Sequence, residues 1–87
     1  MTTTPRIEFP CDYPVKVIAE AEEGLLHEVV SIAQRHDPTL VMTRVTERMS
    51  RNGAYNAITI QLWATGEGQL QRLFEELKEC QAVRMVL

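Results

Sequence analysis

Residues 41–64, with the sequence VMTRVTERMSRNGAYNAITIQLWA, decide the fold of this chain. β-Branched and other apolar residues alternate with polar ones over residues 41–50 and more regularly over residues 55–64. This period of two is typical of strands with one buried face. Between the two runs stands Asn52-Gly53, the strongest short-range hairpin signal, because both residues accept the positive φ of a two-residue turn. The stretch therefore predicts an antiparallel β-hairpin.

The length of the turn sets the register of this hairpin. A two-residue turn places Val45 opposite Ile60 and Ser50 opposite Tyr55, whereas a type I turn with a bulge shifts the pairing by one residue. The side of the second strand that carries its large apolar residues should face the core, and these residues are Ile58, Ile60, Leu62 and Ala64.

A strand pattern and a helix pattern stand on each side of the hairpin. Residues 15–21 alternate as a strand, and residues 25–35 follow with the broad apolar stripe of an amphipathic helix that stops at Asp37-Pro38. After the hairpin, we expect Thr65 to cap a second amphipathic helix. Residues 83–87 then alternate as a short last strand.

The order of these elements, βαββαβ, predicts the architecture. Each strand-helix-strand unit needs a right-handed crossover, and two such units joined by a hairpin place both helices on one face of the sheet. We therefore expect an α+β ferredoxin-like sandwich, a four-stranded antiparallel sheet with two helices on one face. This single domain should span residues 15–87. Residues 1–14, where Pro5, Pro10 and Pro14 disfavour a helix or a central strand, should form an extended N-terminal segment.

The composition fits one small globular domain. The chain has 87 residues, of which 45% are hydrophobic, enough for a single core. The net charge of −3 and the pI of about 5.3 give no general attraction to phosphate backbones or anionic lipid. Cys11 and Cys80 have no metal or redox spacing and should be free thiols. We see no signal peptide and no membrane-spanning run, so we expect a cytoplasmic protein without a membrane partner.

Alternation along the strands assigns their residues to the two faces of the expected sheet. The residues expected to face the helices are Val15, Val17, Ala19, Val45, Ile58, Ile60, Leu62, Val83 and Met85. The residues expected on the uncovered face are Lys16, Ile18, Glu20, Arg44, Thr46, Arg48, Thr59, Gln61, Trp63, Arg84 and Val86.

The uncovered face contains a candidate partner-binding surface formed by Lys16, Ile18, Arg44, Arg48, Trp63 and Arg84. Protein interfaces favour such a mixture, and tryptophan and arginine often carry much of the binding energy. Two other interpretations stay open. Charges on an edge strand also prevent aggregation between sheets, and residues 5–12 would cover Trp63 if they folded back over it.

Several stretches spread along the chain carry a family resemblance: residues 7–10 (IEFP), 13–17 (YPVKV), 50–55 (SRNGAY), Ala64-Thr65 and 83–87 (VRMVL). They resemble the YbeD-like family of small bacterial proteins, and the likeness covers nearly the whole chain. The resemblance implies a ferredoxin-like fold and a cytosolic location, and that family has no established catalytic residues.

The turn from the first strand into the first helix carries a second resemblance. Gly24-Leu25-Leu26 is similar to the glycine and following apolar residues that amino-acid-sensing ACT regulatory domains place at this turn. The resemblance makes the loop at Gly24 a candidate effector site.

No set of residues predicts catalysis. His27 and His36 are nine residues apart on one helix, about half a turn out of phase, so they cannot share a metal ion. We find no Ser-His-acid, Cys-His or paired-carboxylate set and predict no cofactor, so the chain is not expected to be an enzyme. The sequence favours a regulatory or adaptor module that binds an unknown protein partner or a small effector. A homodimer is a further possible arrangement.

A nucleic-acid-binding module, and in particular an RNA-binding one, is the alternative function for the uncovered face. RNA-recognition modules stack bases on aromatic side chains of their central strands. In this chain Ala57 and Thr59 stand between Tyr55 and Trp63, so that aromatic signature is missing and nucleic acid is the less favoured partner.

Overall fold

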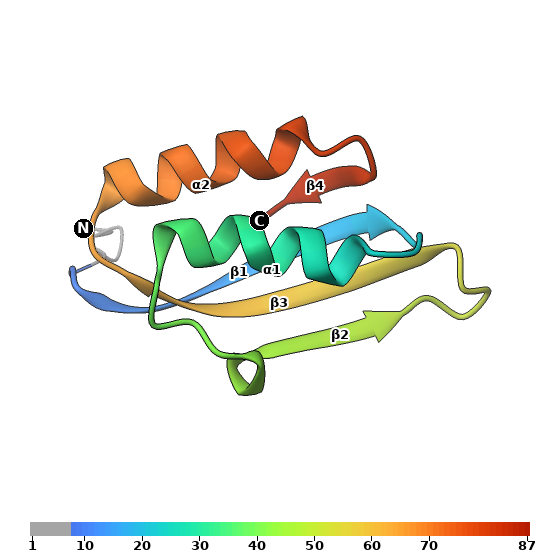
Figure 1. Ribbon diagram of the computed structural model, residues 1–87, viewed down its shortest axis with the longest axis horizontal. Helices are drawn as coiled ribbons and strands as arrows, with labels where there is room; N and C mark the ends of the chain where they lie inside the picture. The colour runs from blue at the N-terminus through green and yellow to red at the C-terminus, as the bar shows by residue number, and fades with distance from the viewer. Residues whose placement is uncertain (1–7) are drawn as a thin grey trace, which may run out of the picture.

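Two ten-residue strands form the middle of a four-stranded sheet in the computed structural model, which describes residues 8–87 (Figure 1). The sheet order is β2-β3-β1-β4, and all neighbours are antiparallel. The predicted ferredoxin-like α+β sandwich is confirmed. No helix among residues 8–87 has the length and apolar character needed to cross a membrane. The elements in chain order are β1 (Cys11–Glu20), α1 (Leu25–His36), the 3-10 turn η1 (Met42–Arg44), β2 (Val45–Met49), β3 (Tyr55–Ala64), α2 (Glu67–Glu79) and β4 (Val83–Val86).

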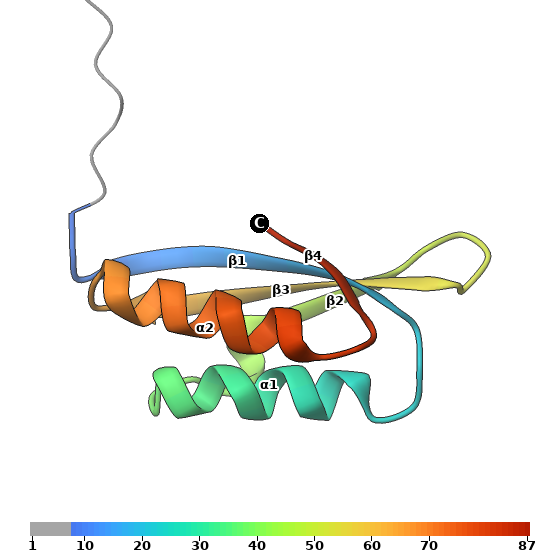
Figure 2. The ribbon, with the colours of Figure 1, turned by 90° about the horizontal axis from the view of Figure 1, so that it is seen from above.

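The hydrophobic core lies between the sheet and the two helices, which lie on the same side of it (Figure 2). Alternate residues of the central strands point toward the helices, as the sequence pattern predicted. Each large aliphatic side chain buried in this way contributes roughly 1.5–3 kcal/mol to stability. Among residues 8–87, no helix lies on the opposite face of the sheet. The largest side chains without solvent exposure are Ile58, Ile60, Leu62, Leu73, Leu77, Val15, Val17 and Val29.

The hairpin has the register predicted for a two-residue turn, but its turn is longer. Val45 lies opposite Ile60, and the pairing continues to Met49 opposite Asn56. The Gly53 N–H donates to the Ser50 carbonyl at 2.9 Å, which closes a four-residue β-turn. Gly53 has a φ of 74°, whereas no described residue other than glycine has a positive φ. Only one of the two turn residues therefore adopts the conformation that we expected of both.

β1 begins at Cys11, four residues before the predicted start of the first strand at Val15. The strand tolerates Pro14 because of where β4 ends. Lys16 exchanges both of its backbone hydrogen bonds with Leu87. The backbone groups of Pro14, two residues earlier, point to the same side, where no strand among residues 8–87 pairs with them, so the missing N–H of proline removes no pairing within this part of the chain. The part of the predicted N-terminal segment formed by residues 1–7 lies outside the described residues.

The second strand was predicted too long, because residues 41–50 do not form a single strand. Val41 is extended, residues 42–44 form η1, and β2 begins only at Val45. The consequence for the site is that Arg44 stands in a 3-10 turn rather than on a strand.

A β-bulge in β4 reverses the predicted orientation of two residues. Ala19 pairs with Val83, but Ile18 pairs with Met85, so the pairing skips Arg84. Met85 therefore points to the uncovered face and is 52% exposed, whereas Val86 packs against the core. The predictions of Met85 facing the helices and of Val86 on the uncovered face were both wrong.

The predicted cap of α2 is also wrong. The residue before the helix is Gly66, and no side chain caps it. Thr65 instead donates its backbone N–H to Oε1 of Gln69 at 2.8 Å. Gln69 is buried and donates from Nε2 to the carbonyls of His36 and Trp63 at 2.7 and 3.2 Å.

Two buried side chains complete the edge of β3 where β2 has not yet begun. The backbone of Trp63 faces the β2 side of the sheet, but β2 pairs no further than Ile60. The Trp63 N–H donates to Oδ2 of Asp37 at 2.9 Å, and its carbonyl accepts from Gln69. Asp37 and Gln69 thus make the two backbone hydrogen bonds that a neighbouring strand would otherwise make. These bonds stabilise the fold, because a buried backbone group without a partner costs free energy.

Candidate functional site

The uncovered side of the sheet, which we call the open face, is the candidate binding surface. Residues paired across neighbouring strands share a face, so the observed register identifies its members. Lys16 lies beside Thr59 and Thr46, and Ile18 lies beside Ala57 and Arg48 in the next row. The open face comprises Asp12, Pro14, Lys16, Ile18, Glu20, Thr46, Arg48, Tyr55, Ala57, Thr59, Gln61, Trp63, Met85 and Leu87.

Two of the four candidate cations are in ion pairs with acidic side chains, and two are not. Arg44 pairs with Asp12, and Arg84 pairs with Glu20 at 2.6 Å. Hydrogen bonding to Glu20 raises the pKa of Arg84 further above its usual range. Among the described residues no acidic partner lies within ion-pair distance of Lys16 or Arg48. Lys16 and Arg48 are therefore the cations that the fold leaves available.

A polar hollow of about 390 Å³ lies between these two cations. Its floor is formed by small side chains of β2 and β3, with the hydroxyls of Thr46 and Thr59 among them. Glu47 also borders it, but Oε2 of this residue accepts a hydrogen bond from the Asn56 amide at 2.8 Å. Two cations and two hydroxyls around one hollow suit a carboxylate or another small anionic group. The lining residues are Lys16, Thr46, Glu47, Arg48, Ala57 and Thr59.

A second, more apolar hollow of about 260 Å³ adjoins the first one. Arg48 and Ala57 line both, so the two hollows meet at these residues. The small side chain of Ala57 leaves the space that a larger residue of β3 would fill. The pair of hollows suits a group that is anionic at one end and apolar at the other. The residues that line the second hollow are Ile18, Arg48, Met49, Ser50, Tyr55, Asn56 and Ala57.

The structure brings only some of the predicted site residues together. Lys16, Ile18 and Arg48 line the two adjoining hollows. Trp63 is 38% exposed at the far end of β3, where Asp12 of β1 lies beside it. Arg44, Arg84 and Gly24 line neither hollow. Gly24 is the exposed residue before α1, and its φ of 81° accounts for the glycine without any ligand.

Sequence reasoning missed several residues that shape this region. Tyr55 and Ala57 were not proposed as site residues, although the same alternation that selected Thr59 includes them. Leu87, 59% exposed, and Met85 were missed because the bulge in β4 decides which way they point.

Asp37 is a buried carboxylate whose role the sequence did not reveal. Burial pushes the pKa of Asp37 upward, but hydrogen bonds from Thr39 and from the Trp63 N–H outweigh this, with help from the charge of Arg44. The pKa therefore lies below the usual 3.8. Its Oδ1 accepts from the N–H and the hydroxyl of Thr39 at 3.0 and 2.5 Å. The sequence Asp-Pro-Thr, a turn in which the aspartate bonds to the backbone two residues on, was the available signal.

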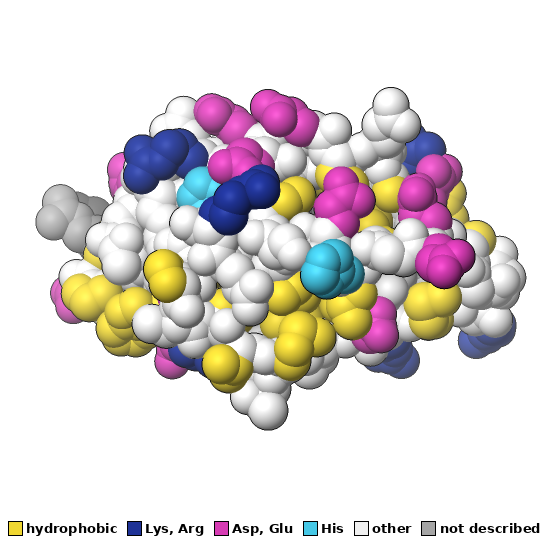
Figure 3. All heavy atoms as spheres, in the orientation of Figure 1, with side chains coloured by type: hydrophobic (Ala, Val, Ile, Leu, Met, Phe, Trp, Pro, Cys, Tyr) yellow, Lys and Arg dark blue, Asp and Glu magenta, His cyan; other side chains and the backbone are white. Residues whose placement is uncertain are grey.

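Charge is distributed unevenly over the molecule. The helix-bearing side in Figure 3 shows many acidic side chains, over α2 and toward the end where α1 starts, with a few basic ones among them. The acids of the open face, Asp12 and Glu20, are both in ion pairs. The open face is thus more cationic than the net charge of −3 suggests. Within residues 8–87, no three or more His, Cys, Asp or Glu side chains lie close enough to hold a metal ion.

Comparison with known families finds a match over nearly the whole chain. The family model described as "Protein of unknown function (DUF493)" matches residues 4–87. A UPF0250 protein of Azotobacter vinelandii is 44% identical over 84 residues, which covers 95% of this chain and 91% of that protein. A UPF0250 protein of Nitrosomonas europaea is 37% identical over 87 residues and is matched over the full length of both chains. The resemblance to a family of small bacterial proteins is confirmed.

Solved structures show the same fold at low sequence identity. The solution structure of protein HP0495 from H. pylori has a TM-score of 0.75 and 14% identity, and the match covers 99% of this chain and 90% of that one. The ACT domain from GTP pyrophosphokinase of Chlorobium tepidum has a TM-score of 0.66 and 14% identity, with coverage of 88% and 97%. The likeness to ACT domains at the level of the fold is confirmed.

Proposed function

The chain belongs to the DUF493 family of proteins of unknown function, and we propose that it is a non-catalytic adaptor module that binds a protein partner through the open face of its sheet. The observation that carries the proposal is the pair of adjoining hollows around Arg48 and Ala57. An aspartate or glutamate of the partner fits the polar hollow between Lys16 and Arg48. A neighbouring aliphatic or aromatic side chain of the partner fits the apolar hollow beside Ile18.

The charge pattern supports an acidic partner surface. Arg44 and Arg84 are neutralised within the chain, so Lys16 and Arg48 provide the charge complementarity. Around them Ile18 and Met85 supply apolar area, which interfaces combine with cationic side chains. An acidic partner would also approach the open face in preference to the acidic helix side, because opposite charges steer association.

The arrangement of aromatic side chains favours protein over RNA. Tyr55 and Trp63 both lie on the open face, but they stand at opposite ends of β3. They are eight positions apart along the strand, a distance of roughly 26 Å. Successive bases of a single strand therefore have no pair of neighbouring aromatic platforms at the centre of the sheet.

Site-specific photo-crosslinking in the cell that makes the protein tests the proposal. Benzoylphenylalanine is placed at Gln61, which is exposed on the open face and lines neither hollow. We expect one protein to be crosslinked reproducibly. The double variant Lys16→Glu, Arg48→Glu should abolish that crosslink, because it replaces both available cations with acids.

A matched control separates local from general charge effects. Arg51→Glu with Arg72→Glu makes the same change in net charge at exposed residues that line neither hollow. We expect this variant to keep the crosslink. Loss of the crosslink in both double variants, or its survival in Lys16→Glu, Arg48→Glu, would contradict the proposal.

A further inference from the structure

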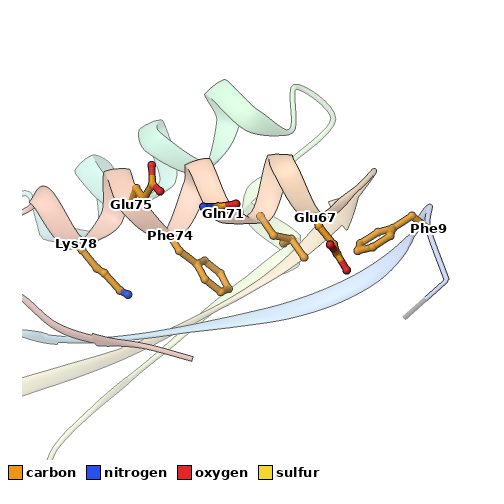
Figure 4. A pocket seen from close by; sticks show the side chains of 7 residues that line it. Phe9, Glu67, Gln71, Phe74, Glu75 and Lys78 are labelled. Carbon is orange, nitrogen blue, oxygen red and sulfur yellow. The ribbon is translucent and has the colours of Figure 1, made fainter. Parts of the chain in front are cut away.

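A groove of about 480 Å³ runs along α2 on the side of β1. Its lining positions on α2 recur every three or four residues, so they share one face of the helix. In Figure 4 the side chains of Phe74 and Glu67 extend from α2 on the side where β1 runs, with Phe9 at the end nearest the start of β1. Phe9, Leu70 and Phe74 make the groove apolar. The full lining, which we call the α2 groove, consists of Phe9, Glu67, Leu70, Gln71, Phe74, Glu75 and Lys78.

Among residues 8–87, no strand pairs with the outer backbone edge of β1 over the half of the strand that lies beyond β4. The pairing of β1 with β4 ends where Lys16 exchanges two hydrogen bonds with Leu87. Backbone groups point to the same side at every second residue of a strand. The N–H and C=O of Asp12 and the C=O of Pro14 therefore point to this side, where no strand among residues 8–87 pairs with them.

From this juxtaposition we propose that the α2 groove and the free edge of β1 together bind an extended segment of a partner protein, which adds to the sheet in line with β4. The free backbone groups select a strand, because a helix has no backbone groups left to pair with them. The two parts are also of similar length. The stretch of α2 from Glu67 to Lys78 spans roughly 17 Å, and residues 11–15 of β1 span roughly 13 Å.

The side chains of the groove define the chemistry of that segment. Alternate residues of an added strand point toward the helix, where Phe9, Leu70 and Phe74 offer apolar contacts. Lys78 stands at one end of the lining stretch and Glu67 at the other. The segment should therefore carry two alternating apolar residues, an acidic residue toward Lys78 and a basic residue toward Glu67. If the bound segment runs antiparallel to β1, as β4 does, its N-terminus lies at the Lys78 end of the groove.

Pro14 limits the register in which a strand can pair with this edge. Prolines on a free edge commonly block strand addition, because they offer no N–H. At this edge Pro14 still offers its carbonyl, and Asp12 offers both groups. The occupant is therefore held in a register that pairs with Asp12, and replacing the proline should strengthen binding rather than leave it unchanged.

NMR titration of the ¹⁵N-labelled full chain with a synthetic peptide tests the proposal. The probe is the blocked heptapeptide Glu-Thr-Val-Thr-Val-Thr-Lys, and the control peptide has its glutamate and lysine exchanged. We expect millimolar concentrations of the probe to shift the amide signals of Asp12 and of residues 70–78. The control peptide should bind several-fold more weakly. Absence of these shifts, or equal binding of both peptides, overturns the proposal.

Three variants test the backbone contacts themselves. Pro14→Ala adds an N–H facing the groove and should tighten binding about two- to tenfold, the effect of one hydrogen bond. Asp12→Pro removes the Asp12 N–H and should bind more weakly, by a similar factor, than Asp12→Ala, which also lacks the carboxylate but keeps that N–H. Unchanged affinity in Pro14→Ala, or the same affinity in Asp12→Pro and Asp12→Ala, overturns the proposal. Pro14→Ala keeps the test decisive if Asp12→Pro folds poorly.

Discussion

Replacement of Asp37 by alanine should be among the most damaging single changes to the fold. The carboxylate accepts hydrogen bonds from the Thr39 N–H, the Thr39 hydroxyl and the Trp63 N–H, and the residue is only 3% exposed. Alanine leaves the Trp63 N–H without a partner, because Trp63 lies in the part of β3 that β2 does not reach. A buried group left in this state costs about 1–3 kcal/mol, and the lost bonds to a charged acceptor add to it. We expect Asp37→Ala to lower the free energy of unfolding by about 2–4 kcal/mol.

Urea unfolding at neutral pH measures this loss, with Asp12→Ala as the control. Asp12 is an exposed carboxylate paired with Arg44, so its removal should cost under about 1 kcal/mol. If the two variants lose the same free energy, the role assigned to Asp37 is wrong.

The effect of Asp37 should also depend on pH. Because its pKa is lowered in the folded chain, its stabilising contribution is complete above the usual 3.8 and is lost as pH falls through the folded value. The stability gap between the parent chain and Asp37→Ala should therefore stay constant from about pH 7 to pH 5 and narrow below about pH 4. A gap that widens in acid would refute the assignment.

Three other substitutions test the fold and the open face. Gly53→Val should cost about 1–3 kcal/mol in chemical denaturation, because a β-branched residue is strained at positive φ, whereas Gly53→Asn should cost clearly less; equal losses would mean that backbone strain is not the cause. Val86→Asp should lower the free energy of unfolding by about 2 kcal/mol or more, because it places a charge against the core, whereas Met85→Asp on the open face should have little effect. A larger loss in Met85→Asp than in Val86→Asp would mean that the bulge in β4 lies elsewhere. Trp63→Ala should weaken partner binding or self-association with little change in the unfolding midpoint, whereas a loss of several kcal/mol would show that Trp63 belongs to the core.

Local patterns predicted the parts of the fold that depend on neighbouring residues. The alternation of β3 and the Asn52-Gly53 pair were enough to give the hairpin register, because a turn constrains the strands that it joins. The direction of Met85 was not predictable in this way. It depends on a one-residue bulge against β1, a strand that lies more than sixty residues earlier in the chain.

In the candidate site, too, local patterns predicted some features, whereas others depend on contacts between residues far apart in the sequence. Lys16, Ile18 and Arg48 lie on the predicted face because alternation alone places them there. The neutralisation of Arg44 and Arg84 depends on contacts over 32 and 64 residues of sequence, which no local pattern contains. A list of cations on one face therefore overestimates the charge that is available to a partner.

The unequal lengths of the strands imply an uneven distribution of motion. β2 and β4 both pair with the same half of the β1–β3 ladder, so among residues 8–87 the sheet has four strands there and only two beside residues 11–14. Two-stranded ribbons are marginally stable on their own, and segments of this kind open without global unfolding. Amide hydrogens of residues 61–64 should exchange with solvent through such local opening, faster than those of residues 56–60. The α2 groove borders the half of the sheet that opens first, so a bound segment there would slow this exchange and stiffen the least stable part of the molecule.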